Sequence, residues 1–367
     1  MTAKMSRRLV WWWPVLALAF FGLASIYGVG AEFRPSPLGV ILATALLPVL
    51  FGTVFAAVYH SEVIAVRTGE PYGTLVLTVA VTVIEVALIT SVMAAGHGSS
   101  TLARDSVFAV VMLVCNGLVG LCIVIGGLRY HEQSFRVSGA GSYLMVVMTL
   151  AILTLVLPDY TTSVTGPYYS TPQMIFVSLA TIALYATFLY IQTVRHRDYF
   201  ILELDDAGAS HRASQSEKAV AASTVFLLLS LAVIVLLAKK FAAVLTAVLA
   251  STKAPSAVGG IVVALLVLLP EAMAAVTAAR NNQLQKSINL ALGSTLATIG
   301  LTIPAVAAVS IGSGQGIALG LDQKDTVLLV LTFAVSLLTF ATGRTNILAG
   351  FVHLVLLATF MFLVFAP

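Results

Sequence analysis

The sequence predicts an all-α protein that crosses a membrane many times. Hydrophobic residues make up 59% of the 367 residues, charged residues make up only 9%, and the mean hydropathy is +1.03. Ordinary soluble domains carry about 25% charged residues. A transmembrane helix needs about 20 consecutive apolar residues, and the chain holds about eleven such segments. We therefore expect a polytopic membrane protein with about 11 transmembrane helices.

The expected spans follow one another along the whole chain, separated by short polar connections. A further apolar stretch, Phe241–Leu249, is too short to span and either extends the seventh helix or lies at the membrane surface. His60 directly follows the second span, so we expect it to be solvated. The spans are expected at residues 9–30, 38–59, 73–95, 105–128, 140–157, 172–194, 219–238, 257–279, 287–310, 325–341 and 346–366.

The first apolar segment could be a signal peptide, because basic residues precede it. No small-residue cleavage motif follows, and the segment is long enough to span. We therefore expect a retained N-terminal transmembrane helix within residues 1–37. Cys115 and Cys122 are seven residues apart in one segment. This spacing separates them by about 10 Å along a helix, so we expect small buried thiols and no disulfide.

The longest polar break divides the remaining spans into two sets of five. Residues 195–218 are rich in Gly, Ser and charged side chains, a composition typical of a flexible linker. We expect a first five-helix repeat at 38–194 and a second at 219–367. Because five is an odd number, the two repeats would have opposite orientations. Lys and Arg gather in loops on the side of the linker, so we expect a cytoplasmic linker and N-terminus and an outer C-terminus.

Two glutamates occupy matched positions in these sets. Glu85 follows Gly73 by twelve residues, and Glu271 follows Gly259 by twelve residues, each inside an apolar stretch. A charged carboxylate at bilayer depth costs at least roughly 2.5–3.5 kcal/mol. A single intramembrane glutamate can serve as a satisfied interhelical hydrogen-bonding group, but a matched pair indicates a transporter with one site near the midplane.

Neighbouring residues offer neutral oxygen ligands to a cation. Thr82 lies one helical turn before Glu85 on the same face. Pro270 precedes Glu271 and removes a backbone donor, so a carbonyl near Val267 or Leu268 would be free to face a cation. The ninth span is rich in small and hydroxyl residues, which serve either close helix packing or ligation. Its candidate residues are Asn289, Gly293, Ser294, Thr295 and Thr298.

Such a site suits either a cation or protons. Ca²⁺ takes six to eight oxygen ligands from carboxylates, carbonyls, hydroxyls and water. Protons on the same two carboxylates would neutralise the site without a metal, because burial and a nearby like charge both favour the protonated form. Competition between the two is the basis of exchange. Asn116 in the fourth span and His353 in the last are expected to be packed, hydrogen-bonded residues.

Several short motifs resemble the cation/calcium exchanger superfamily, and most of all its bacterial calcium/proton antiporter branch. The resemblance covers nearly the whole chain after the first span. Each motif is weak alone, but their order and spacing are specific. They are Glu70-Pro-Tyr-Gly73, Val83-Ile-Glu85-Val, Arg104-Asp105, Pro270-Glu271, Asn281-Asn282-Gln283, Asn289-Leu-Ala-Leu-Gly293-Ser294, Leu296-Ala-Thr298-Ile and Thr342-Gly-Arg344-Thr-Asn346.

The resemblance implies an extra first helix followed by two inverted five-helix repeats, with one acidic ligand from each repeat. Glu85 and Glu271 would then bind the metal and carry the protons, and Ser294 would contribute a hydroxyl. Thr82 stands where many members carry an asparagine, and Leu268, through its backbone carbonyl, takes that place in the second repeat. The usual Gly-Asn before each acid is missing, so the site is poorer in neutral side-chain oxygens than calcium-selective members.

The resemblance implies a secondary cation/proton antiporter of the bacterial inner membrane, most consistent with Ca²⁺ export in exchange for H⁺. A Na⁺/H⁺ or K⁺/H⁺ antiporter using the same site is the alternative, since the branch is linked to these ions too. No cofactor and no nucleic-acid partner are expected, and nothing predicts an oligomeric state. An intramembrane enzyme with paired carboxylates would need a nucleophile or an HExxH-type set, and a channel would need a ring-like filter; the sequence shows neither.

Overall fold

The computed structural model describes residues 7–27, 36–69, 72–94, 100–200, 217–314 and 316–366. Within these ranges, ten helices are long and apolar enough to cross a membrane, and a shorter apolar helix, Val10–Ile26, precedes them. This confirms the predicted all-α polytopic fold. Glu70 and most of the expected linker, 201–216, lie outside the described residues.

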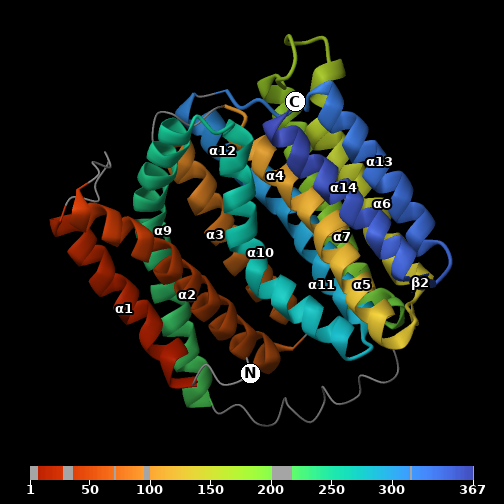
Figure 1. Ribbon diagram of the computed structural model, residues 1–367, viewed down its shortest axis with the longest axis horizontal. Coiled ribbons are helices and arrows are strands. Elements are labelled where there is room, and N and C mark those ends of the chain that lie inside the picture. The colour runs from red at the N-terminus through yellow and green to blue at the C-terminus, as the bar shows by residue number, and fades with distance from the viewer. Residues whose placement is uncertain are drawn as a thin grey trace. The chain divides into compact units, whose positions relative to one another are not determined.

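The described residues form two compact units, and each unit draws helices from both halves of the sequence. The first unit ends within one long helix, α10, between Gly259 and Gly260. Its elements, followed by colour in Figure 1, are α1 (Arg7–Ile26), α2 (Pro37–Thr68), α3 (Tyr72–Ala94), α9 (Glu217–Thr252) and the start of α10 (Ser256–Arg280).

Helix α2 is the centre of the first unit, because it contacts α1, α3 and α9. The indole Nε1 of Trp13 donates to the carbonyl oxygen of Val49 at 3.0 Å. Gly52 makes room for this contact, since a Cβ there would overlap the Trp13 ring. The first helix is therefore held to the unit by a specific hydrogen bond as well as by apolar packing.

The expectation for His60 was wrong. Helix α2 continues to Thr68, and His60 is 0% exposed. Its Nδ1 lies 3.3 Å from the Ser223 hydroxyl of α9, and the rings of Trp11 and Phe226 pack against it. The polar residues after position 59 end the apolar run but not the helix, because neighbouring helices supply their hydrogen-bond partners.

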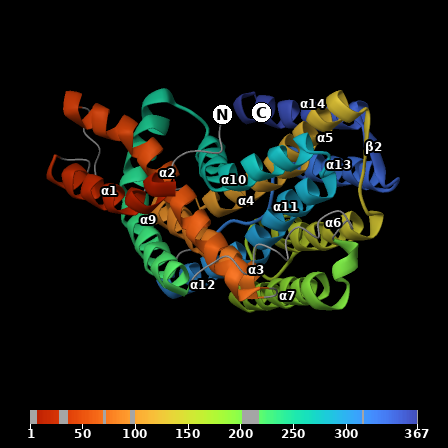
Figure 2. The same cartoon turned by 90° about the horizontal axis from the view of Figure 1, so that it is seen from below.

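The second unit contains the remaining elements and is mostly helical. Figure 2 shows its helices from below, with β2 at one side. Its α-helices are α4 (Leu102–Met112), α5 (Val119–Tyr130), α6 (Val137–Ala151), α7 (Thr171–Tyr190), α11 (Leu284–Ala297), α12 (Ile303–Ser313), α13 (Gln323–Phe340) and α14 (Ile347–Phe365). The π-helical turns are Leu113–Leu118, Ile152–Val156, Ile191–Arg195 and Thr298–Thr302, and the 3₁₀ turns are Leu157–Tyr160 and Arg197–Tyr199.

Two of the π-helical turns interrupt long membrane helices in the same way. The turn Leu113–Leu118 joins α4 to α5, and the turn Thr298–Thr302 joins α11 to α12. Single π turns inside α-helices often mark functional positions. Each of these helices is the third of its expected repeat. A π-helical turn in the third helix of each half is what two related repeats would produce. The repeat assignment itself stays a prediction.

Helices α5 and α14 pack side by side through glycines, as both Figure 1 and Figure 2 show. A Cβ at Gly120 would lie 2.9 Å from the Cβ of His353, and one at Gly350 would lie 2.9 Å from the Gly120 carbonyl oxygen. Small residues allow backbones in a membrane to approach closely. Cys115 and Cys122 lie in this region as free, buried thiols, as predicted.

A two-stranded sheet closes one end of the second unit. Strand β1 (Glu132–Ser134) pairs antiparallel with β2 (Arg344–Asn346). The side chain of Gln133 donates to the carbonyl oxygen of Ala279 at 3.2 Å and to the side-chain oxygen of Asn282 at 3.0 Å. The strands therefore tie α5 and α14 to the end of α10. Helix α9 contains the stretch Phe241–Leu249, which confirms that this stretch extends the seventh span.

The packing of α5 on α14 predicts that Gly120→Ala destabilises the protein. The added methyl group would overlap the Cβ of His353, and overpacking a tight core costs about 1–3 kcal/mol. We expect a lower apparent Tm for the purified protein in detergent. Gly141→Ala on α6 is the control, because nothing lies within 4 Å of its added Cβ. A Gly120→Ala protein as stable as the Gly141→Ala protein would contradict this packing.

Candidate functional site

The first predicted carboxylate lies deep in the first unit. Glu85 is on α3, which contacts α2 and α9, and its residue is only 2% exposed. Thr82 lies one turn earlier on the same helix face and is half-buried. A carboxylate in such surroundings costs free energy unless it is protonated, hydrogen-bonded or bound to a cation. The burial of Glu85 therefore agrees with its predicted role, which stays a prediction.

The second predicted carboxylate lies in the second unit. Glu271 is half-buried on α10, and Leu268 is buried one turn before it. Pro270 lies inside α10, which stays helical from Ser256 to Arg280. In a continuous helix, a proline removes the donor for the carbonyl four residues earlier, which belongs to Leu266. The Leu266 carbonyl oxygen therefore lacks the amide donor that a helix would normally give it. The role of the Leu268 carbonyl stays a prediction.

Helix α11 brings the predicted hydroxyl residues into the same unit. Ser294 is half-buried, whereas Thr295 and Thr298 are buried. The hydroxyl of Thr295 donates to the carbonyl oxygen of Ala291 in its own helix at 3.4 Å. Thr298 opens the π-helical turn that follows α11. A Cβ at Gly293 would make only ordinary contact with Tyr143, 3.6 Å from its hydroxyl oxygen, so this glycine is not required by close packing there.

A hydrogen bond sets the register between α10 and α11. The Ser287 hydroxyl donates to the carbonyl oxygen of Ala275 at 2.7 Å. The two helices are joined by a short turn, so they run antiparallel. Leu268 lies seven residues before Ala275, and Ser294 lies seven residues after Ser287. Each is thus about 10 Å from the shared contact along its own helix axis. Glu271 falls between Leu268 and this contact.

The two predicted supporting asparagines make other hydrogen bonds. The amide of Asn289 donates to the carbonyl oxygen of Phe200 at 2.6 Å and accepts from Gln285 at 2.8 Å. Asn116, in the π-helical turn after α4, bonds to Thr332 and His353. Both amides therefore hold neighbouring segments of the second unit together. His353 is fully buried and hydrogen-bonded, as the sequence predicted.

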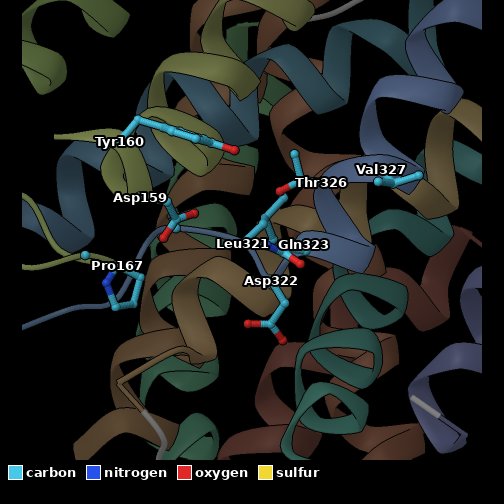
Figure 3. Close-up of a pocket in the computed structure, with 10 residues that line it drawn as sticks. Asp159, Tyr160, Pro167, Leu321, Asp322, Gln323, Thr326 and Val327 are labelled. Carbon is cyan, nitrogen blue, oxygen red and sulfur yellow. The ribbon is translucent and has the colours of Figure 1, made fainter.

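A cavity of about 710 Å³ lies where α13 begins, and sequence reasoning missed it. Figure 3 shows lining side chains that include Asp159, Asp322 and Thr326. Its lining residues come from the 3₁₀ turn Leu157–Tyr160 after the fifth span, from the following loop, and from the segment that leads into the start of α13. The one signal in the sequence was the Arg104-Asp105 motif, because Arg104 ties this region to α4.

Charge pairing organises the wall of this cavity. Arg104 donates to the carboxylate of Asp105 at 2.9 Å and to the Gly320 carbonyl oxygen at 2.8 Å. Its Nη1 also lies 3.9 Å from Asp322, and Lys324 lies 3.9 Å from the same carboxylate. In the part of the chain that the structure describes, no group of three or more His, Cys, Asp or Glu residues is arranged to hold a metal ion. Two of these ion pairs therefore meet at Asp322, which lines the cavity.

The predicted site residues are divided between the two units. Glu85 and Thr82 belong to the first unit, and the remaining residues belong to the second. Within the second unit, the structure brings Leu268, Glu271 and Ser294 onto two helices joined by a short turn and a hydrogen bond. It gives Asn116 and Asn289 structural partners of their own.

The known proteins that this chain resembles are described as ion exchangers and transporters. A family profile described as "Sodium/calcium exchanger protein" matches residues 36–194 and 222–366. The chain is 44% identical over 331 residues to "Putative ionic transporter y4hA" of Sinorhizobium fredii (strain NBRC 101917 / NGR234), with 89% of each chain covered. It is 36% identical over 334 residues to "Sodium-potassium/proton antiporter ChaA" of Escherichia coli (strain K12), with 90% of each chain covered.

Solved structures show the same fold at low sequence identity. The structure of native YfkE is similar with a TM-score of 0.73 and 17% identity, covering 98% of this chain and all of YfkE (100%). The structure of the H⁺/Ca²⁺ exchanger CAX has a TM-score of 0.66 and 16% identity, covering 95% of this chain and 88% of CAX. With a family profile over both halves and two relatives along nearly the full length, this chain belongs to the sodium/calcium exchanger protein family of multi-pass secondary transporters.

Proposed function

We propose that this protein is a secondary active antiporter that exchanges an inorganic cation for protons. The observation that carries the proposal is the pair of glutamates at matched positions in apolar helices, with Glu85 only 2% exposed. Buried carboxylates in membrane helices are rare, and they mark ion and proton pathways. Family membership and the proton-coupled relatives ChaA and CAX support the same reaction class.

In the proposed mechanism, Glu85 and Glu271 act on the same cation. The deprotonated pair binds the cation, and protons neutralise the pair when the cation leaves. Either form can therefore move through an apolar protein without net carboxylate charge, whereas the empty charged form is unfavourable. Transport of one ion without the other would require the empty, charged site to change sides. Because this form is unfavourable, cation and proton movements are coupled. Alternating exposure of this site to the two sides of the membrane completes the cycle.

Neutral oxygens complete the proposed cation shell. Thr82 and Ser294 supply hydroxyls, and the carbonyl of Leu268 is the proposed backbone ligand. Leu268 and Ser294 lie at the same height along the antiparallel helices α10 and α11, which supports including both as ligands. Thr295, Thr298, Gly293 and Pro270 shape the helices that carry these groups, and Asn116 and Asn289 brace the surrounding segments.

Calcium is the proposed ion, exported in exchange for H⁺. Two carboxylates match the charge of one Ca²⁺, and carbonyls and water complete a flexible oxygen shell. The fold is similar to that of CAX, an H⁺/Ca²⁺ exchanger, which is consistent with Ca²⁺ as the ion. A Na⁺/H⁺ or K⁺/H⁺ antiporter is the second candidate, favoured by 36% identity to a sodium-potassium/proton antiporter. The small number of neutral side-chain oxygens beside the glutamates also fits a monovalent ion.

We propose that the protein resides in a bacterial inner membrane with its N-terminus in the cytoplasm and its C-terminus outside. The distribution of Lys and Arg among the loops supports this orientation. Two five-helix repeats, 38–194 and 219–367, follow the extra helix in residues 1–37, with the linker 195–218 on the cytoplasmic side. The two separate stretches matched by the family profile support this division.

Glu85→Gln and Glu271→Gln are each expected to lower exchange at least about tenfold, the factor that 1.4 kcal/mol represents. Glutamine keeps the shape of the side chain but can neither bear charge nor titrate. The measurement uses proteoliposomes that contain a pH dye and are pulsed in turn with Ca²⁺, Na⁺ and K⁺, which also identifies the ion. Glu217→Gln is the control, because its side chain is 91% exposed. Near wild-type exchange by either variant would remove that glutamate from the site.

The apparent affinity for the cation is expected to weaken as pH falls. Binding requires deprotonated ligands and releases protons, so protons compete at low pH. The affinity should be highest at alkaline pH and fall as the pH is lowered through a window of about pH 9 to 6, because protons displace the cation from the carboxylates. Half-saturation concentrations measured in proteoliposomes at equal internal and external pH test this. Affinity that stays constant across the window would mean that protons and the cation bind at separate sites.

The inverted repeat predicts that the segments before the two glutamates begin on opposite sides of the membrane. Cysteines introduced at Glu70 and Ser256, in a protein lacking Cys115 and Cys122, should react with an impermeant thiol reagent from opposite sides. The cysteine at position 70 should react from the cytoplasmic side, because it follows the basic last turn of α2 with Arg67, and the cysteine at position 256 should react from outside. Intact cells and inside-out vesicles give the two accessibilities. Labelling of both from one side would contradict the repeat and the single-site mechanism.

A further inference from the structure

A buried hydrogen-bond network lies in the second unit, away from both glutamates in the sequence. The ring Nδ1 of His353 is 3.1 Å from the Oδ1 of Asn116, and its Nε2 is 3.1 Å from the hydroxyl of Thr339. The Nδ2 of Asn116 donates to the hydroxyl oxygen of Thr332 at 2.8 Å. Asn116, Thr332 and His353 are each 0% exposed. The network therefore joins the π-helical turn after α4 to both α13 and α14.

The chemistry of the partners assigns the protons. The Thr332 hydroxyl donates to the sulfur of Met112 at 3.5 Å, so its oxygen accepts from the Asn116 amide. The Oδ1 of Asn116 can only accept, and His353 must therefore donate from Nδ1. In the neutral ring, Nε2 then accepts from the Thr339 hydroxyl. Each polar group of the network has a partner while the histidine carries no charge.

The surroundings of His353 also favour the neutral ring. Helix α14 carries no charged residue. The charged residues of the neighbouring elements lie at the ends of those elements, so helical rise places them at least about 10 Å from His353 along the helix axes. They are Arg104 and Asp105 on α4, Arg129 on α5, Lys324 and Asp325 on α13, and Arg344 on β2. The titratable groups nearer in sequence are Cys115 and Cys122, and both are neutral buried thiols.

Close packing fixes His353 in this place. Its Cβ occupies the space above Gly120, where an added Cβ would lie only 2.9 Å away. Leu357, one turn later on α14, packs in the same way over Gly117, within the π-helical turn. The ring therefore has little freedom, and it holds Asn116 at a defined position in the turn 113–118.

The turn 113–118 also contacts α11, a helix that carries residues of the proposed site. The segment Leu113–Leu118 and the adjoining α5 contact α11, the helix that carries Ser294 and Thr295. A π-helical turn has an irregular backbone and needs support from surrounding groups. A shift of the turn would therefore move the surface against which α11 packs.

We infer that His353 is a positioning residue for cation binding: as a neutral hydrogen-bond donor it fixes Asn116 and the π-helical turn against α11, and it carries no transported proton. The inference rests on the proposed antiport function, since cation binding is what the position of α11 would affect. A buried titratable side chain such as His353 could be taken for a proton carrier. Under this inference, only the glutamates carry protons.

Two matched amide substitutions test which link matters. In His353→Asn, the amide nitrogen takes the place of Nδ1 and keeps the bond to Asn116. In His353→Gln, the amide nitrogen takes the place of Nε2 and can still bond to Thr339, now as the donor to its hydroxyl oxygen. His353→Leu removes both links. We expect His353→Asn to retain the wild-type half-saturation concentration, and both other variants to raise it about tenfold, as for loss of a buried hydrogen-bonded pair.

The proton readouts separate positioning from proton transport. In proteoliposomes, the number of protons exchanged per cation and the pH dependence of half-saturation should be unchanged in all three variants. Thr332→Val should weaken cation binding in the same direction as His353→Leu, because it removes the other link to Asn116. Thr154→Val is the matched control, since this buried hydroxyl bonds only to Leu150 of its own helix among the described contacts. Apparent Tm values in detergent confirm folding.

Distinct outcomes overturn the inference. Loss of proton coupling, or a changed pH dependence, in both His353→Asn and His353→Gln would make His353 a proton carrier. Unchanged cation affinity in His353→Leu would show that the network does not position the site. Wild-type protein that exchanges no cation for protons would instead refute the proposed function, while the order of Tm values would still report on the network.

Discussion

The structure depends on one constraint: a polar side chain inside an apolar bundle must be hydrogen-bonded, neutralised or bound to a ligand. The chain meets this constraint in two ways. His60 and Asn116 are fully buried, and each has a hydrogen bond to a hydroxyl group of another helix. For Glu85 and Glu271 we propose a second way, in which a bound cation or protons neutralise the carboxylate. Residues of the first kind hold helices together, whereas the proposed role of the second kind is transport.

Hydrogen bonds of the first kind connect segments far apart in the sequence. His353 and Asn116 are separated by 237 positions, and Gln133 reaches Asn282 across 149. In hydrocarbon there is no hydrophobic force between helices, so packing and such bonds hold a bundle together. Each compact unit accordingly contains helices from both halves of the sequence. Neither unit can therefore form from one half of the sequence alone. The proposed antiport cycle also needs the two carboxylates to be presented by segments that can move.

The sequence predicted the helices well, because an apolar run of about 20 residues has few other interpretations. Helix ends were less accurate. Helix α2 continues through His60 to Thr68, and α9 extends over 36 residues, since polar residues with tertiary partners can continue a helix. The π-helical turns were not predicted, because they arise from tertiary contacts such as those of Asn116 and have no signal in hydropathy. The cavity beside Asp322 was missed for the same reason, as its walls come from three separate segments.

The carboxylates of the candidate site could be proposed from the sequence, whereas the contacts around them could not. Matched spacing singled out Glu85 and Glu271, whereas the bond between Ser287 and Ala275 that sets the register of α10 and α11 could not be read from residue types. The two halves are also unequal. The first glutamate has the hydroxyl of Thr82 one turn before it, and the second has Leu268, which offers only its backbone. In the proposed site, the first half would offer a cation side-chain oxygens, whereas the second would offer a backbone carbonyl and the Ser294 hydroxyl. Under this proposal, carbonyl and water ligands would contribute more to ion selection than the matched carboxylates alone suggest.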